Sequence, residues 1–114
     1  MNILLIVNES PWGSSLGLTA LRLARVLLTR GQRLAAVYFR EEGVYHALQG
    51  EADAGTPDLR QAWLDLAREH RVPLLLCSSA VARRFEGTDT KGFRTAGLAE
   101  VLELMVSCDH QLSF

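Results

Sequence analysis

The sequence predicts an α/β fold: one domain, residues 1–114, built as a three-layer sandwich around a mostly parallel, flavodoxin-like sheet of about five strands. Two observations lead to this prediction. Short runs of leucine and β-branched residues alternate along the chain with amphipathic segments, as repeated βα units do. The runs are apolar at successive positions, which is typical of parallel strands covered by helices on both faces. A chain of 114 residues has the length of one domain.

The first part of the chain predicts a strand, a helix and a second strand. Residues 3–7 read Ile-Leu-Leu-Ile-Val, a run that fits a central parallel strand. An apolar stripe at helical spacing, which includes Leu21 and Leu28, predicts the helix, and Gly31 is a suitable C-terminal stop. Residues 34–39, again apolar, form the second strand.

A short helical piece and a longer helix follow. Residues 42–48 have room for one or two helical turns, and the small residues of 50–55 predict a loop. Thr56 is a candidate N-cap of the next helix, with Pro57 at its first position. Trp63 lies on the apolar stripe of that helix, so we expect it in the core.

The last third of the chain predicts two more strands and two more helices. Residues 72–77 form a buried strand, and a helix begins at Ser78. The segment Phe85–Arg94 is polar and contains two glycines, so we expect a mobile surface loop. Residues 110–114 are a plausible final edge strand. The preceding helix is amphipathic, with its apolar face formed by Leu98, Val101, Leu102 and Met105.

Composition excludes several classes of protein. Hydrophobic residues make up 48% of the chain and charged residues 22%, as in a soluble globular domain. The formal net charge of -1 supplies no basic surface for nucleic acid or anionic lipid. No apolar run approaches the ~20 residues of a membrane-spanning helix. The N-terminus lacks the features of a signal peptide, and two cysteines are too few for a disulfide framework. We expect a cytoplasmic protein.

Cys77 is the strongest candidate for chemistry. It ends the third strand and stands directly before the helix that begins at Ser78. Backbone N–H groups and the helix dipole favour an anion in that position, so the thiol pKa is expected to fall below its free value. The alternative is that Cys77 packs as a small hydrophobe. Arg83 and Arg84, later in the same helix, are most simply a solvated face.

Other candidate sites have weaker signatures. The loop Asn8–Gly17 follows the first strand but has neither a P-loop nor a dinucleotide fingerprint. A turn rich in serine and glycine before a helix could still bind an anion, or it is an ordinary βα loop. The histidines His46, His70 and His110 lie in different segments, with no metal-ligand spacing. For Cys108 we favour a structural role.

Several segments resemble the DsrE/TusD family of sulfur-relay proteins. They occur in matching order over nearly the whole chain, and the resemblance is closest to the TusD/DsrE-type subunit, whose active cysteine matches Cys77. The segment between Arg84 and Gly97 is shorter than in that subunit, where a longer loop crosses the region of the active cysteine. The segments that carry the resemblance are Glu42–Ala47, Asp58–Trp63, Leu76–Arg84 and Ser107–Asp109, with the terminal Phe114.

The resemblance implies a persulfide carrier of sulfurtransferase type. Cys77 would accept a sulfane sulfur from an upstream donor and pass it to a cysteine on a mobile tail of a TusE/DsrC-type acceptor. The pathway would be tRNA 2-thiolation, without direct contact to nucleic acid, or cytoplasmic sulfur oxidation. The only intermediate would be a covalent cysteine persulfide, so no cofactor or metal is expected.

The resemblance also implies a hexamer, either homomeric or built with TusC- and TusB-like (DsrF- and DsrH-like) subunits. We expect Val44 and Tyr45 near an interface in that assembly. Two other functions remain open from the sequence. The chain could be a non-catalytic structural subunit of such an oligomer, with Cys77 in its core, or a small-molecule module that binds an anion in the Asn8–Gly17 loop.

Overall fold

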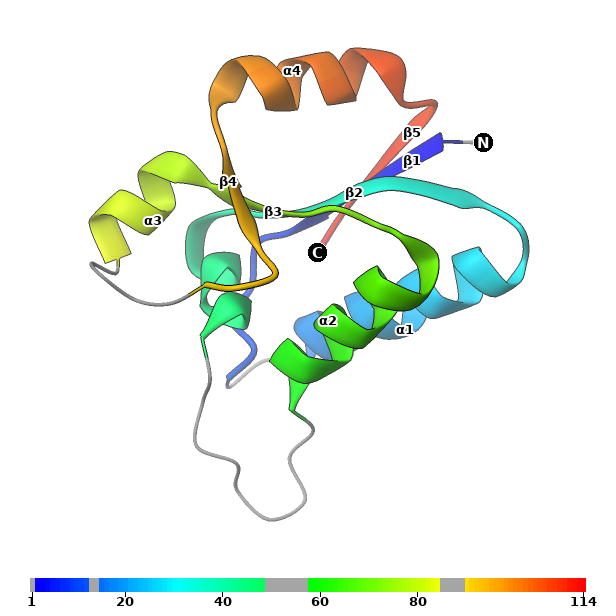
Figure 1. The fold of residues 1–114 in the computed structure, drawn as a ribbon, viewed down its shortest axis with the longest axis horizontal. Helices are drawn as coiled ribbons and strands as arrows, with labels where there is room; N and C mark the ends of the chain where they lie inside the picture. The colour runs from blue at the N-terminus through cyan, green and yellow to red at the C-terminus, as the bar shows by residue number, and fades with distance from the viewer. Residues whose placement is uncertain (1, 13–14, 49–57, 85–89) are drawn as a thin grey trace.

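The computed structural model describes residues 2–12, 15–48, 58–84 and 90–114. Strands, α-helices and one 3₁₀ helix (η1) alternate along the chain (Figure 1). In chain order the elements are β1 (Asn2–Val7), α1 (Leu16–Thr29), β2 (Arg33–Phe39), η1 (Glu41–Ala47), α2 (Leu59–His70), β3 (Leu74–Cys77), α3 (Ser78–Arg84), β4 (Arg94–Ala96), α4 (Leu98–Ser107) and β5 (His110–Ser113).

The strands form one five-stranded sheet in the order β4-β3-β2-β1-β5. Every pairing is parallel. Helices α1 and α2 cover one face of the sheet and α4 covers the other (Figure 1). The predicted α/β class with a parallel, three-layer sheet is therefore confirmed. The strand order differs from the 2-1-3-4-5 order of flavodoxin, because β2, β3 and β4 extend to one side of β1 and β5 returns to its other side.

The central position of β1 explains its continuous apolar run. Ile3, Leu5 and Val7 contribute to the core beneath α1 and α2, whereas Leu4 and Ile6 contribute to the core beneath α4. Alternate residues of a strand point to opposite faces, so a strand buried on both faces needs apolar residues throughout.

The prediction that Phe85–Arg94 is a polar surface loop is wrong at its C-terminal end. Phe93 is buried in the core and Arg94 begins β4, an edge strand paired with β3. Backbone hydrogen bonds to β3 form this strand. The side chains of Arg94 and Thr95 are exposed, so no apolar run in the sequence indicated a strand here. Within the rest of the predicted loop, Lys91 and Gly92 form an exposed turn, and residues 85–89 lie outside the described residues.

The start of α2 also differs from the prediction. Asp58 is the N-cap, and its side chain accepts a hydrogen bond from the backbone N–H of Gln61 (3.1 Å). The candidate cap Thr56 and the neighbouring Pro57 lie outside the described residues, and the helix begins at Leu59. Aspartate and threonine are both good N-caps, so composition alone did not choose between them.

The apolar residues of α4 do not all face the core. Val101 is buried and packs on the sheet. Leu98, Leu102 and Val106, spaced four residues apart, are 73%, 50% and 88% exposed. The predicted apolar face is therefore wrong for Leu98 and Leu102. The helix is apolar around most of its circumference, so helical periodicity could not identify the one sector that contacts the sheet.

A buried hydrogen-bonded pair joins α2 to the carboxyl edge of the sheet. Trp63 is fully buried, as expected, and its Nε1–H donates to Nδ1 of the equally buried His46 (3.1 Å). Because Nδ1 accepts, Nε2 of His46 carries the proton and donates to the backbone oxygen of Glu9 (3.0 Å). His46 thereby connects η1 and α2 to the segment after β1.

Glycine is required beside this pair. A Cβ atom on Gly17 would lie only 2.6 Å from Cε1 of His46, so a side chain there would displace the imidazole. A Cβ on Gly43 would overlap the backbone carbonyl of Val7. These two close approaches let α1 pack against η1 and η1 pack against the end of β1.

The first prediction concerns acid stability. Burial lowers the pKa of His46 to about 4 from its ordinary value of 6.5, although the hydrogen bond to the Glu9 carbonyl opposes the shift. Between these values the unfolded chain binds a proton that the folded chain does not, so the free energy of unfolding falls as pH decreases from about 6.5 to 4. The loss reaches about 3 kcal/mol.

Denaturant unfolding across this pH range, compared between wild type and His46→Asn, measures this contribution. The amide of asparagine keeps an acceptor for Trp63 but does not titrate, so the variant should lose the corresponding pH slope. His70→Asn, at the exposed end of α2, is the matched control and should keep it. An unchanged slope in His46→Asn contradicts the assignment.

Candidate functional site

Cys77 lies at the carboxyl edge of the parallel sheet. It is the last residue of β3, is paired with Ala96 of β4, and is followed at once by α3. The side chain is half-buried, so the thiol is neither enclosed in the core nor freely projecting. The carboxyl edge of an open parallel sheet is where α/β proteins place their binding sites.

Hydrogen bonds from two elements converge on the Cys77 thiol. Its Sγ lies 3.3 Å from Oγ of Ser79 in α3. The side chain of Tyr38 in β2 and the backbone N–H groups of Ser79 and Ala80 are also hydrogen-bond partners of the thiol. Three of these four partners belong to the first turn of α3, so the helix start supplies most of the polar environment.

The net effect of these partners is to favour the thiolate. Partial burial by itself raises the pKa of Cys77, but the hydrogen bonds from Ser79, from Tyr38 and from the two backbone N–H groups together outweigh it, so the pKa of the thiol lies below its ordinary value. This is the direction expected for a cysteine at a helix start. A stabilised thiolate is the reactive form of cysteine as a nucleophile.

Sequence reasoning missed Tyr38 and Ser79 as neighbours of the thiol. Tyr38 pairs with Leu75 across β2 and β3, and Cys77 is two residues beyond Leu75 on the same face of the sheet. The sequence shows both strands but not their relative register, so this contact could not be predicted. Ser79, two residues from Cys77, was visible in the sequence as a polar residue in the first turn of the helix.

The arginines of α3 have different environments. Arg83 is 62% exposed, as expected for a solvated face. Arg84 is only 27% exposed, with its guanidinium 5.7 Å from the centre of the Tyr45 ring and Nη2 3.7 Å from Glu41. The prediction of a solvated Arg84 is therefore wrong, because η1 packs against α3 and supplies both an aromatic ring and a carboxylate.

Residues 44 and 45 face in different directions. Val44 is completely buried within the chain, so its side chain packs in the core. That Val44 and Tyr45 lie near an interface stays a prediction. Tyr45 is half-buried, and its ring centre lies 5.7 Å from that of the exposed Trp12. Trp12, Tyr45 and Arg84 therefore form an aromatic and basic group beside α3.

The Asn8–Gly17 loop begins at the same edge of the sheet. The backbone N–H of Asn8 donates to the carbonyl oxygen of Phe114 (2.6 Å), and the N–H of Trp12 donates to Oγ of Ser10 (3.0 Å). These contacts tie the loop to the C-terminal residue and to itself. Residues 13 and 14 lie outside the described residues, and anion binding by this loop stays a prediction.

Cys108 is far from Cys77 in the fold. It follows α4 and precedes β5, which places it at the amino edge of the sheet, opposite to Cys77. Burial and the nearby Asp109 carboxylate raise the pKa of its thiol, although a hydrogen bond with Ser107 acts in the other direction. Both cysteines are free. The thiol pKa values of Cys77 and Cys108 are therefore shifted in opposite directions.

The histidines described here lie in separate parts of the fold. His46 is part of the core, and His70 at the end of α2 lies 3.9 Å from Glu69. Across residues 2–12, 15–48, 58–84 and 90–114, no three histidine, cysteine, aspartate or glutamate side chains come close enough to hold a metal ion. Within the same ranges, no helix has the length and apolar character needed to cross a membrane.

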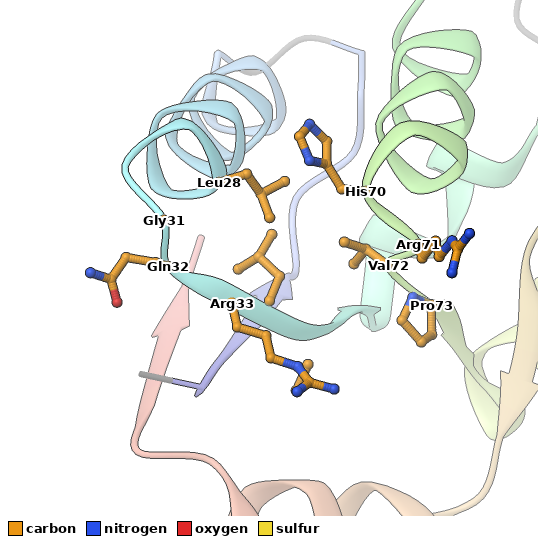
Figure 2. Close-up of a pocket in the computed structure, with 10 residues that line it drawn as sticks. Leu28, Gly31, Gln32, Arg33, His70, Arg71, Val72 and Pro73 are labelled. Carbon is orange, nitrogen blue, oxygen red and sulfur yellow. The ribbon is translucent and has the colours of Figure 1, made fainter.

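A cavity of about 490 Å³ lies at the amino edge of the sheet, away from Cys77. Figure 2 shows Leu28 of α1 and His70 of α2 beside it, with Val72 and Pro73 in the segment before β3. Arg33 and Arg71 also contribute to its lining. None of the partners of Cys77 lines this cavity, so it is separate from the candidate site.

Comparison with known proteins agrees with this fold and with the sequence resemblance. The sequence model of the DsrE/DsrF-like family matches residues 1–114. The chain belongs to the DsrE/DsrF-like family. Curated relatives named Sulfurtransferase TusD include that of Sodalis glossinidius, 33% identical over 96% of this chain and 95% of the relative, and that of Salmonella arizonae, 32% identical over the full length of both.

The solved structure of the YchN protein from E. coli is similar throughout. Its TM-score is 0.86, with 24% identity, over 100% of this chain and 99% of that chain. This likeness concerns the fold. The alignment with the Salmonella arizonae relative spans 128 positions, whereas this chain has 114 residues, so the relative carries residues that this chain lacks. That they are missing between Arg84 and Gly97 stays a prediction.

Proposed function

We propose that this protein is a sulfur-relay sulfurtransferase that carries sulfane sulfur as a persulfide on Cys77. The observation that carries the proposal is the half-exposed thiol at the junction of β3 and α3, surrounded by hydrogen-bond partners that favour its thiolate. Membership of the DsrE/DsrF-like family and the TusD relatives of nearly equal length support the same role.

The chemistry is two thiolate exchanges without net oxidation. In loading, the Cys77 thiolate attacks the outer sulfur of a donor persulfide, R–S–SH. A Cys77 Sγ–S bond forms, the donor S–S bond breaks, and the donor leaves as a thiolate. In delivery, an acceptor thiolate attacks the outer sulfur of protonated Cys77–S–SH, and Cys77 leaves as a thiolate. Both steps proceed fastest when the leaving thiol has a low pKa.

The surroundings of Cys77 suit a carrier. The other cysteine, Cys108, is at the opposite edge of the sheet, so it cannot resolve the persulfide into an internal disulfide within the folded chain. The partial exposure of Cys77 allows a donor or acceptor cysteine to approach. We propose a TusE/DsrC-type acceptor, an upstream sulfane-sulfur donor and a cytoplasmic location, in tRNA 2-thiolation or in sulfur oxidation.

We further propose that the carrier works in an oligomer of DsrE-like subunits, either a homohexamer or a hexamer with TusC- and TusB-like partners. The exposed stripe of Leu98, Leu102 and Val106 on α4 supports this assembly. A helix that is apolar around most of its circumference is normally buried, and contiguous exposed apolar side chains mark interaction surfaces.

The second prediction tests the stripe. Replacing Leu102 by glutamate places a charge in the middle of it and should shift the protein to smaller species in sedimentation velocity at micromolar concentration, since burying an unpaired charge is costly. Val26→Glu, on the outer side of α1 where Val26 is 52% exposed, is the matched control and should sediment as wild type. A monomeric wild type, with no related subunits co-purifying, contradicts the proposed assembly.

The third prediction tests the carrier. After incubation with a sulfane-sulfur donor, the intact mass should increase by one sulfur atom, and reductant should remove it. Cys77→Ser should abolish the adduct, because serine cannot form a persulfide. Cys108→Ser is the control and should load as wild type. Loading of Cys77→Ser at the wild-type level would assign the sulfur to another residue and end the proposal.

A further inference from the structure

Tyr38 is a buried polar side chain that directly adjoins the reacting sulfur. It is 7% exposed and belongs to the core cluster beneath α4, against which Cys77 also packs. The register between β2 and β3 places Tyr38 opposite Leu75, with Cys77 on the same face of the sheet two residues further on. The hydroxyl at the end of this long side chain hydrogen-bonds the thiol.

Tyr38 and the start of α3 approach the thiol from different elements. Ser79 and the backbone N–H groups belong to the helix that follows Cys77, whereas Tyr38 comes from the neighbouring strand. The tyrosine is therefore the one partner among the four whose position depends on strand pairing and not on local sequence. Its hydroxyl approaches the thiol from β2, the strand next to β3.

The hydroxyl of Tyr38 stays a hydrogen-bond donor while Cys77 ionises. Burial, followed by the hydrogen bond and the charge of Cys77, raises the pKa of the phenol, and Glu41 acts in the same direction while Arg40 opposes it. The phenol therefore keeps its proton over the range in which the thiol loses its own. A donor of this kind stabilises a thiolate more than it stabilises a neutral thiol or a thioether-like sulfur.

We propose that Tyr38 is a catalytic hydrogen-bond donor that stabilises Cys77 as the leaving thiolate when the persulfide is handed to the acceptor. This inference rests on the carrier function proposed above and adds to it a residue from a second strand. In the persulfide, Sγ of Cys77 is neutral and bonded to the outer sulfur. As the acceptor thiolate attacks the outer sulfur, the Sγ–S bond breaks and negative charge develops on Sγ, beside the Tyr38 hydroxyl.

The same hydrogen bond has a smaller effect on loading. A stabilised thiolate is more abundant near neutral pH but is a weaker nucleophile, and the two effects partly cancel. In delivery there is no such compensation, because Cys77 is then the leaving group. Removing the hydroxyl should therefore slow delivery more than loading.

The experiment compares Tyr38→Phe with wild type, both in a Cys108→Ser background, so that Cys77 is the only thiol that can be alkylated or loaded. Tyr38→Phe keeps the ring and its packing and removes only the hydroxyl. The first measurement is the rate of alkylation by iodoacetamide as a function of pH, which follows the thiolate population. The second is the single-turnover rate of sulfur loss from the loaded protein to a small thiol in excess.

We expect the alkylation midpoint of Tyr38→Phe to move to higher pH, as for loss of one hydrogen bond to a charged group. The rate below that midpoint should fall only about three- to tenfold, because a thiolate with a higher pKa is a better nucleophile and offsets part of the lost population. Sulfur loss to the small thiol should slow, and loading should change less. Tyr45→Phe is the matched control, since it removes a hydroxyl from η1, and its midpoint should equal that of wild type.

An unchanged midpoint and an unchanged rate of sulfur loss in Tyr38→Phe overturn the proposal. If circular dichroism shows that this variant is unfolded, Tyr38→Met, with a flexible apolar side chain and no hydroxyl, decides by the same two measurements. The alkylation profile is measured on the thiol itself and does not require loading with sulfane sulfur. A wild type that fails to load sulfur therefore refutes the carrier function, while the profile still shows whether Tyr38 stabilises the Cys77 thiolate.

Discussion

The parallel direction of all five strands is the constraint on which the rest of the structure depends. It brings the ends of β1, β2 and β3 to one edge of the sheet, where Cys77, η1 and the segment after β1 meet. At this edge α3 begins directly after Cys77, and the backbone N–H groups of its first turn are hydrogen-bond partners of the thiol. The same constraint separates Cys108 and the cavity at the amino edge from this site.

Buried hydrogen bonds and close backbone approaches connect the elements at the carboxyl edge. The imidazole of His46 connects α2 to the carbonyl of Glu9, and Gly43 lets η1 lie against the end of β1. η1 in turn packs against α3 and provides Glu41 and Tyr45 to Arg84. These contacts fix the surroundings of the half-exposed thiol, as the proposed sulfur exchange needs.

The sequence was sufficient for features that depend on local pattern. Apolar runs predicted β1, β2 and β3, and helical spacing predicted the buried Trp63. The strand-to-helix junction predicted the position of Cys77 at the end of β3. Features that depend on tertiary packing could not be predicted. β4 is a three-residue edge strand with exposed side chains, Tyr38 reaches Cys77 through strand register, and Leu98 and Leu102 of α4 face outward because the sheet buries only the sector around Val101.

The central claim is that sulfur bound to Cys77 is delivered to a protein acceptor. Its most direct test is a single-turnover transfer: the protein is loaded with sulfane sulfur, freed of donor and mixed with a TusE/DsrC-type acceptor, and the intact masses of both proteins are followed in time. The account predicts that this chain loses one sulfur atom as the acceptor gains one, and that an acceptor without its tail cysteine gains none. Sulfur that stays on this chain, or leaves at the same rate without an acceptor, would contradict it.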